Sequence, residues 1–556
     1  MDRRKFVKTV GAASASMAIP FSIRAGNNLK ETLAGKRPNI ILMMVDDMGF
    51  ADIGCYGSEI ATPNLNRLSE NGIKFTEFYN CARCCPSRAS LMTGLYPHQT
   101  GIGHMTNPEF DYGKPGYRGR MNQNCVTIAE ALKPAGYHTF MTGKWHLGKK
   151  PGQYPINRGF EEYYGLNEGA GNYFRPGELM RNDQYIDPND LPENYYTTDA
   201  FTDTAIEMIR DHQPDGKPFF LYLAFNAPHW PLHAKPDDIA KYENRYTQGW
   251  DALREERYER EKALGIINPK WRLSDRDSEA PAWEELSAGL KEKMARKMAV
   301  YAGMIDCVDQ NIGKLMRSLE KMGIQDNTLI LFLSDNGACW ETGAFGFDFN
   351  PKYSMKKYKE ISEIGTDKSF VSYGRSWSNA GNTPFRLHKH WVHEGGIATP
   401  LIAYWPKEIK EKGKMTGELG HIMDIMPTCL ELAGAEYPKE FGGNQITALE
   451  GKSLLPVLEG KGREGHAIIG WEHEGNRGLR RKNWKLVSEY PHEWELYDLD
   501  EDRTEMSNLA DRYPDQAREL MDQYEAWAKR CWVEPWNPVN KYWPFVRELL
   551  TRDLKK

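Results

Sequence analysis

Polar residues follow two short apolar runs of this chain, and their types suit the binding of a hard cation. Asp46 and Asp47 come directly after residues 39–45, and Asp335 and Asn336 come just after residues 328–333. Three carboxylates and one amide oxygen form a ligand set that Ca²⁺ and Mg²⁺ prefer, whereas Zn²⁺ favours His and Cys. We therefore expect these four side chains to hold one divalent cation.

Cationic and imidazole side chains follow two further apolar runs. Lys144 and His146 come after residues 137–141, and His229 comes after residues 219–225. Taken singly, such residues are common in turns and loops. Ligands of open parallel sheets, however, bind beyond the carboxyl ends of the strands. If all four runs are strands of one sheet, these residues and the carboxylates meet at one edge.

A cysteine cluster at residues 81–85 supplies the nucleophile that this set lacks. Cys84 and Cys85 precede Pro86, and proline suits the first turn of a helix. We therefore expect Cys84 at a helix N-terminus, where backbone N–H groups and the helix dipole favour an anion. Two structural alternatives remain open: half of a zinc site with Cys81, or disulfides through Cys81 or Cys85. The sequence holds no second Cys-x-x-Cys, and its nine cysteines leave at least one thiol unpaired.

The order of the predicted elements indicates an α/β fold. Short apolar runs alternate with helical patterns, which predicts a large, mainly parallel sheet covered by helices on both faces. The predicted strands are residues 39–45, 137–141, 219–225, 328–333 and 401–405, and the predicted helices are 127–135, 202–212, 295–322 and 421–434.

The pattern changes toward the C-terminus. Short half-polar runs at 466–471, 484–490 and 495–498, then an amphipathic stretch at 515–530, predict a small antiparallel sheet with one helix. We therefore divide the chain into a catalytic domain at 27–460 and a C-terminal subdomain at 461–556. Two long polar insertions, 235–290 and 341–381, are expected to form walls or lids of the site.

The first 26 residues are interpreted as an export signal of the twin-arginine type. Arg3 and Arg4 precede a weakly apolar stretch of small residues that ends near Ala25. This predicts a periplasmic or extracellular protein. No apolar run approaches the ~20 residues that a bilayer crossing needs. With 72 Lys and Arg against 77 Asp and Glu, the net charge of −5 excludes a nucleic-acid binder that works through bulk positive charge.

The cysteine cluster resembles a known signature. Cys84-Cys85-Pro86-Ser87-Arg88, followed by Thr93-Gly94, is similar to the C-x-P-S-R motif of the type I sulfatases of the alkaline phosphatase superfamily. The resemblance continues through the stretches around Asp46, Lys144, His229 and Asp335 and through residues 383–396. It covers residues 37 to about 530 and is greatest for the bacterial arylsulfatase branch.

The resemblance implies a chemical mechanism. In that family a maturation enzyme oxidises the first Cys of the motif, here Cys84, to formylglycine. One hydroxyl of the hydrated aldehyde attacks sulfur, and the other expels sulfate. The cation implied at Asp46, Asp47, Asp335 and Asn336 is Ca²⁺ rather than Mg²⁺. The remaining implied roles are these: Arg88 steadies the formylglycine, Lys144 and Lys389 contact sulfate oxygens, His146 helps to break down the sulfated intermediate, and His229 protonates or orients the leaving oxygen.

Some residues have no role in the resemblance. His388, His390 and His393 add imidazoles near Lys389, and we expect them to pack or to line a substrate wall. Four aromatic residues are candidates to stack on a sugar face or an aromatic ring, or else to pack locally: Trp230, Trp250, Tyr373 and Trp377. The substrate class stays open between an aryl sulfate and a sulfated glycan.

Two other functions compete with a sulfatase. The first is a phosphonate monoester or phosphodiester hydrolase of the same superfamily, which can share the C-x-P-S-R element. The second is a glycan-binding relative without catalysis, against which the intact set of nucleophile, cation and lysine positions argues.

Overall fold

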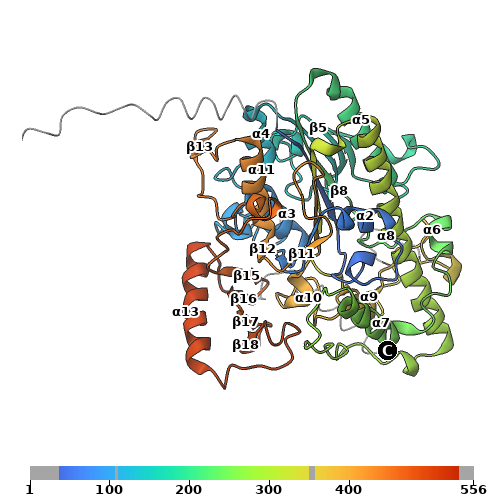
Figure 1. Ribbon diagram of the computed structural model, residues 1–556. Coiled ribbons are helices and arrows are strands. Elements are labelled where there is room, and N and C mark those ends of the chain that lie inside the picture. The colour runs from blue at the N-terminus through green and yellow to red at the C-terminus, as the bar shows by residue number, and fades with distance from the viewer. Residues whose placement is uncertain (1–36, 107–109, 350–356, 537–556) are drawn as a thin grey trace, which may run out of the picture. The chain divides into compact units, whose positions relative to one another are not determined.

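A computed structural model describes residues 37–106, 110–349 and 357–536 of the chain. The predicted export signal at 1–26 lies outside them. A ten-stranded sheet in the described part runs through the protein with helices on both sides (Figure 1). Its strands, in spatial order, are β11 (Lys414–Thr416), β2 (Ile73–Phe75), β10 (Leu401–Tyr404), β9 (Thr328–Ser334), β1 (Asn39–Val45), β8 (Phe219–Ala224), β4 (His138–Gly143), β5 (Glu162–Leu166), β6 (Leu179–Arg181) and β7 (Gln184–Tyr185).

The centre of the sheet is parallel, and this aligns the strand ends that carry the predicted site. β1 pairs in parallel with β9 and β8, and β8 pairs in parallel with β4. Val45 lies opposite Ser334, and Ala224 lies opposite both Met44 and Gly143. The four strands therefore end at the same edge. β10, β6 and β7 add antiparallel pairings toward the sides of the sheet.

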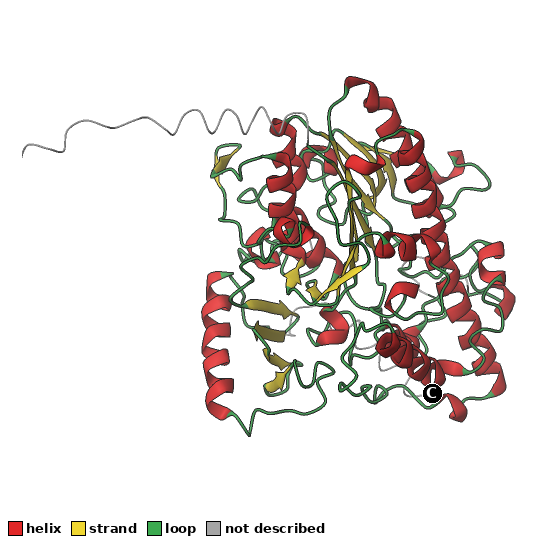
Figure 2. Ribbon diagram, viewed as in Figure 1, coloured by secondary structure: helices red, strands yellow, loops and turns green. Residues whose placement is uncertain are grey.

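Both faces of the sheet are buried, as the fully apolar strands predict. Because successive side chains of a strand point to opposite faces, Ile40, Leu42 and Met44 join one core cluster, whereas Ile41 and Met43 join another. The first core is covered by α3 (Cys84–Thr93), α4 (Ile128–Leu132) and α11 (Ile425–Ala433). The second is covered by α2 (Pro63–Glu70), α5 (Thr197–His212) and α8 (Ala288–Lys321). Figure 2 shows the strands between these helix layers.

The C-terminal part forms the predicted small antiparallel sheet, packed under one long helix. Its strands are β15 (Ile469–His473), β16 (Asn476–Arg481), β17 (Trp484–Ser488) and β18 (Glu495–Asp498), in that order, and α13 (Pro514–Arg530) packs against them. A Cβ at Gly470 would lie 2.3 Å from the ring of Trp527, so this glycine lets α13 approach β15 closely. The α/β fold with its small C-terminal sheet is confirmed, whereas the boundary at residue 460 stays a prediction.

Shorter elements connect these layers. They are β3 (Phe78–Tyr79), β12 (Gly420–His421), β13 (Glu440–Phe441), β14 (Asn444–Gln445), α6 (Pro236–Ala240), α7 (Gly249–Ala263), α9 (Gly374–Gly381), α10 (Glu394–Ile397) and α12 (Leu455–Leu458). Among the described residues, no helix combines the length and apolarity that a membrane crossing requires.

Three of the four candidate stacking residues are part of the core. Trp250 and Trp377 are fully buried, and Tyr373 stacks on Tyr301 at a ring distance of 4.5 Å. The insertions that carry them therefore pack as local core around α7 and α9. Only Trp230 is partly exposed.

Candidate active site

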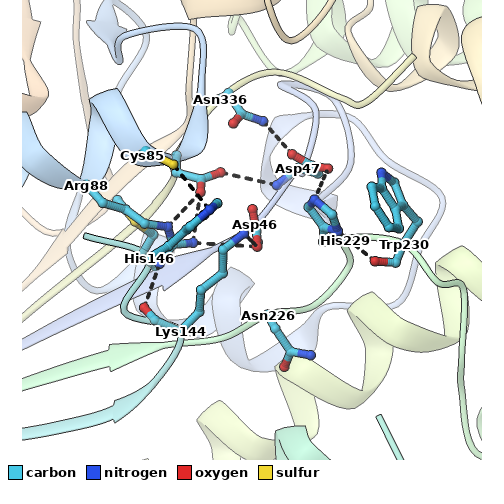
Figure 3. Close-up of polar contacts among 12 residues, drawn as sticks. Asp46, Asp47, Cys85, Arg88, Lys144, His146, Asn226, His229, Trp230 and Asn336 are labelled. Carbon is cyan, nitrogen blue, oxygen red and sulfur yellow. Dashed lines mark hydrogen bonds and ion pairs between the residues drawn. The ribbon is translucent and has the colours of Figure 1, made fainter. Parts of the chain in front are cut away.

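The predicted site residues meet at the carboxyl edge of the central sheet (Figure 3). Asp46 and Asp47 follow β1, Lys144 follows β4, His229 follows β8, and Asp335 follows β9. None of the ten predicted side chains is more than 5% exposed, and the ten are Asp46, Asp47, Cys84, Arg88, Lys144, His146, His229, Asp335, Asn336 and Lys389. The structure therefore brings all of them into one buried site.

Three of the four predicted cation ligands, Asp47, Asp335 and Asn336, are joined by hydrogen bonds that fix their orientation. Asn336 Nδ2 donates to Asp47 Oδ1 at 2.8 Å, and the backbone N–H of Asp47 donates to Asp335 Oδ1 at 3.2 Å. Asp46 Oδ1 and Asn336 Oδ1 are buried without a hydrogen-bond partner among the described residues. An unsatisfied buried oxygen costs about 1–3 kcal/mol. A cation bound between these oxygens would supply the missing partner, so the residues present fit a hard divalent ion.

The charges of the site also favour a bound divalent cation. Burial raises the pKa of Asp335 well above its usual range, and the nearby charge of Asp46 raises it further. Burial likewise raises the pKa of Asp46, although Lys144 opposes this. The three carboxylates face three cationic side chains, Lys144, Lys389 and Arg88, so the site without a bound ion is close to neutral. A divalent cation inverts this balance and makes the site attractive to an anion.

Cys84 is the first residue of α3, as the proline pattern predicts. Arg83 before it is extended, and Gly94 ends the helix with a φ of 69°. A hydrogen bond with Cys85 and the charge of Lys144 lower the pKa of Cys84 well below its usual value, although burial opposes them. All nine cysteines lie in the described part as buried free thiols. No disulfide is therefore formed by Cys81 or Cys85, and Cys81 belongs to none of the groups of three or more candidate metal ligands among the described residues.

Three cationic side chains, Lys144, Lys389 and Arg88, lie within electrostatic reach of Cys84. The Lys144 ammonium is in direct contact with Asp46 Oδ2. Lys389 Nζ lies 2.7 Å from Asp47 Oδ1. Arg88 donates from Nη2 to Asp335 Oδ2 at 2.8 Å and from Nη1 to the carbonyl oxygen of Lys144 at 3.0 Å. Arg88 thereby links the helix of the nucleophile to the ends of β9 and β4.

Both predicted imidazoles are neutral, but their hydrogen-bond partners differ. Burial lowers the pKa of His146 to about 3 and that of His229 to about 4. His229 Nδ1 donates to the carbonyl oxygen of Trp230 at 2.6 Å, which leaves Nε2, 3.4 Å from Asp47 Oδ2, to exchange protons. His146 Nε2 lies 3.3 Å from the thiol of Cys85. A Cβ at Gly169 would lie 2.5 Å from the His146 ring, so this glycine allows the ring its place.

Several residues that support the site were missed by sequence reasoning. Tyr222 OH lies 3.3 Å from Arg88 Nη1, yet it sits inside an apolar strand where nothing marks it. Tyr173 OH donates to the carbonyl oxygens of Asn226 and His229 at 2.6 and 2.8 Å. These bonds hold the loop after β8.

Two of the three unassigned imidazoles are fully buried beside a carboxylate of another segment. His388 Nε2 lies 2.9 Å from Asp277, which the 235–290 insertion supplies. His393 Nε2 lies 3.3 Å from Glu495 of the C-terminal sheet. Both rings are fully buried. His388 and His393 therefore pack in the interior, which is one of the two outcomes that the sequence predicts for them. His390 is partly exposed.

Comparison with known proteins places this arrangement in context. Residues 38–435 match the family model described as Sulfatase, and residues 385–529 match the model for the C-terminal part of N-sulphoglucosamine sulphohydrolase. The chain is 36% identical over 521 residues to an uncharacterized sulfatase of Schizosaccharomyces pombe, covering 88% of this chain and 93% of that protein. It is 34% identical over 471 residues to the arylsulfatase of Klebsiella aerogenes, covering 83% and 99%. It is similar to the crystal structure of Ps i-CgsB with a TM-score of 0.66 at 26% identity, covering 93% and 99%.

Proposed function

This chain belongs to the sulfatase family and is a sulfatase, an enzyme of sulfate ester hydrolysis, and from that premise we propose how its residues act. Cys84 is the precursor of the nucleophile and becomes formylglycine through a maturation enzyme. Once hydrated, formylglycine supplies one hydroxyl that attacks sulfur and another that expels sulfate. The observation that carries the proposal is the place of Cys84 at the start of α3, within reach of the charges of Lys144 and Lys389.

Asp46, Asp47, Asp335 and Asn336 hold one divalent cation. Ca²⁺ suits a site of several protein oxygens better than Mg²⁺, which keeps most of its waters. The unpartnered oxygens of Asp46 and Asn336 support this assignment. When bound, such a cation lowers the pKa of a hydroxyl beside it and polarises a sulfate oxygen.

Lys144 and Lys389 bind the sulfate group. Each ammonium is buried and paired with a carboxylate, so a sulfate oxygen that approaches meets an oriented charge rather than a mobile surface lysine. One charge at ~4 Å contributes roughly 4 kcal/mol at an effective dielectric constant near 20, before desolvation is subtracted. Arg88 fixes α3, the helix that begins at Cys84, relative to these lysines through its hydrogen bond to Asp335.

The two imidazoles handle protons in different parts of the site, His146 beside Cys84 and Cys85 and His229 beside Asp47. His229 presents Nε2 toward the site, where the neutral ring has a lone pair because its proton lies on Nδ1. It orients the leaving oxygen or, after taking up a proton at Nε2 beside Asp47, returns that proton to the leaving oxygen. His146 adjoins Cys84 and Cys85 and accepts a proton when sulfate is expelled. Because His146 is neutral in the free protein, its lone pair is available for this step.

The substrate is a small organic sulfate ester, either an aryl sulfate or a sulfated glycan. We place the enzyme outside the cytoplasm on the twin-arginine pattern of residues 1–26. An exported sulfatase suits substrates of the periplasm or the medium.

Mass spectrometry of the peptide that contains Cys84, combined with kinetics, tests the proposal. We expect the aldehyde in place of the thiol, and release of sulfate from 4-nitrophenyl sulfate in proportion to the converted fraction. A Cys84→Ser variant controls for the nucleophile. Activity that persists with unconverted Cys84 contradicts the proposal, and faster turnover of a nitrophenyl phosphonate or phosphodiester assigns the chain to the alternative hydrolases.

A further inference from the structure

The nucleophile is reached through a rim of partly exposed side chains. Cys84 itself is only 1% exposed, so the group attached to sulfate must rest against the residues just outside it. Arg83, next to Cys84, pairs with Glu341 at 2.8 Å, and Glu341 accepts a hydrogen bond from Trp230 at 2.9 Å. His390, next to Lys389, and Glu474 complete the rim, with 12% and 11% of their side chains exposed.

Glu474 comes from the C-terminal sheet, in the turn between β15 and β16, and two imidazoles hold its carboxylate. His104 Nε2 lies 3.0 Å from Glu474 Oε1, and His390 Nδ1 lies 3.3 Å from Oε2. A third ring, His473, is fully buried without a hydrogen-bond partner among the described residues for either nitrogen. Its Nε2 lies 3.6 Å from Glu474 Oε1.

Three imidazoles and a carboxylate also resemble a Zn²⁺ site, but the hydrogen bonds argue against a metal. Asn476 accepts the N–H of Tyr490 with Oδ1 and therefore donates from Nδ2 to His390 Nε2 at 3.1 Å. His390 must then carry its proton on Nδ1, toward Glu474. His104 Nδ1 accepts the N–H of Met105, so its proton sits on Nε2, again toward Glu474. Both nitrogens that face the carboxylate are donors, not ligands.

The rim has an excess of negative charge at Glu474. Interactions with His390 and His104 lower the pKa of Glu474 well below its usual value, although burial opposes them. Burial lowers the pKa of His390, which keeps that ring neutral. Arg83 is already paired with Glu341. The Glu474 carboxylate thus has imidazole hydrogen-bond donors around it but no Lys or Arg at ion-pair distance among the described residues.

The backbone is strained at the same residues. Glu474 and His390 have positive φ angles of 50° and 94°, as do the site residues Asp47 at 69° and His146 at 55°. Such conformations cost about 1–3 kcal/mol for residues other than glycine, and they concentrate at functional sites. At Glu474 this conformation is the one that the two-residue hairpin loop 474–475 between β15 and β16 requires, so the loop itself fixes Glu474.

We propose that Glu474, oriented by His104 and His390, accepts a hydrogen bond from a hydroxyl of the leaving group. This leaving group is a neutral sugar with a single sulfate. A sugar hydroxyl donates to the free lone pairs of the carboxylate, whereas a second sulfate or a uronate at this position is repelled. The inference rests on the proposed function and adds the class of its leaving group.

Matched kinetics on two kinds of substrate test the proposal. Purified, formylglycine-containing enzyme is assayed with 4-nitrophenyl sulfate, with galactose sulfated singly at each position, and with disulfated galactose. Glu474→Gln is compared with Glu493→Gln, an exposed residue in the loop between β17 and β18. We expect Glu474→Gln to lower kcat/KM for the best monosulfated sugar about 10- to 100-fold, because a hydrogen bond to a charged group is lost. Its kcat/KM for 4-nitrophenyl sulfate, which has no hydroxyl to offer, is expected to stay within about threefold.

A second variant guards against a folding defect. His104→Gln removes one of the two rings that orient Glu474, and we expect the same substrate-dependent loss at smaller size. The melting temperature of each variant is compared with that of the Glu493→Gln control. Equal losses on sugar and nitrophenyl substrates, preferred cleavage of disulfated sugars, or stoichiometric zinc in the active enzyme that depends on Glu474 each overturn the inference. Wild-type enzyme that cleaves 4-nitrophenyl sulfate but no monosulfated sugar also overturns it and leaves the proposed function standing. Failure on every sulfate ester, by contrast, refutes the proposed function itself.

Discussion

Lys389 Nζ lies 2.7 Å from Asp47 Oδ1, and both side chains are about 1% exposed. The pair joins a loop near the C-terminal sheet to the end of the first strand of the central sheet, across 342 residues of sequence. It places a buried ammonium beside one of the proposed cation ligands. Removal of either partner therefore changes both the charge and the geometry of the site.

We predict that Lys389→Ala lowers kcat/KM for a sulfate ester about 100-fold or more. The loss of one buried positive charge removes several kcal/mol of attraction for the sulfate oxygens, and each 1.4 kcal/mol that is specific to the transition state is worth about tenfold. Steady-state kinetics with 4-nitrophenyl sulfate measure the effect, and Lys412→Ala at an exposed position is the control. Near-normal turnover of Lys389→Ala would remove this lysine from the reaction.

Removal of the cation is expected to lower stability as well as activity. A ligand at 100 times its Kd stabilises the folded protein by about 2.7 kcal/mol. Chelation should therefore lower the melting temperature, and Ca²⁺ should restore it more effectively than Mg²⁺. Asn336→Leu keeps a similar volume without the amide oxygen. Calorimetry that shows an equal Ca²⁺ shift in this variant would place the ion elsewhere.

The sequence was sufficient to predict the site where each residue follows a buried strand. Asp46, Lys144, His229 and Asp335 come after apolar runs, and the parallel pairing of those runs alone brings them together. The sequence was insufficient where an element depends on tertiary contacts rather than on a local pattern. β16 is rich in arginine and was not predicted, because Arg480 is buried through contacts with Tyr79 and Glu77 that no local pattern reveals.

The rim around the nucleophile shows the same limit. His104, His390 and Glu474 come from three distant segments, and only the packing of the C-terminal sheet against the loop after Lys389 joins them. Trp250 and Trp377 show the opposite case. Their residue type is typical of a substrate-binding wall, but they are buried against each other at a ring distance of 5.4 Å. Residue type alone does not distinguish a residue of the rim from a residue of the core.

Cys85 is predicted to position His146. Its thiol lies 3.3 Å from His146 Nε2, and burial raises its pKa well above the usual value, so it stays protonated and can donate. Cys85→Ala should lower kcat about three- to tenfold, the value of one neutral hydrogen bond. Rates must be divided by the formylglycine content from mass spectrometry. Cys429→Ala, another buried thiol outside the site, should leave the corrected rate unchanged.

Glu261 makes stability depend on pH. Burial raises its pKa well above 4.5, and neither carboxylate oxygen has a hydrogen-bond partner among the described residues. Above pH 4.5 the unfolded chain ionises this group while the folded protein keeps it protonated, so stability falls as pH rises toward the folded pKa. Glu261→Gln should therefore be more stable than wild type at pH 8 and lose that advantage near pH 4.5. Urea unfolding at both pH values measures this, with exposed Glu255→Gln as control.

A buried ion network fixes the C-terminal sheet to the loop that carries Lys389. Lys485 Nζ lies 2.8 Å from both Glu394 Oε1 and Glu505 Oε1, and Arg503 Nε lies 2.8 Å from Glu394 Oε2. Glu394 is the first residue of α10, five residues after Lys389. The network thus connects the small sheet to the reaction site.

We predict that Lys485→Met destabilises the protein by about 3–5 kcal/mol, because it leaves two carboxylates without their shared cation in a buried place. Exposed Lys482→Met, in the same sheet, should change the unfolding free energy by less than about 0.5 kcal/mol. The double variant Lys485→Met with Glu505→Gln removes the charge of Glu505, whereas Glu394 keeps its contact with Arg503. It should therefore be more stable than Lys485→Met alone, and a double-mutant cycle on urea unfolding gives the coupling. If the two substitutions simply add, the ions do not act as a network, and the small sheet must be held by its apolar contacts alone.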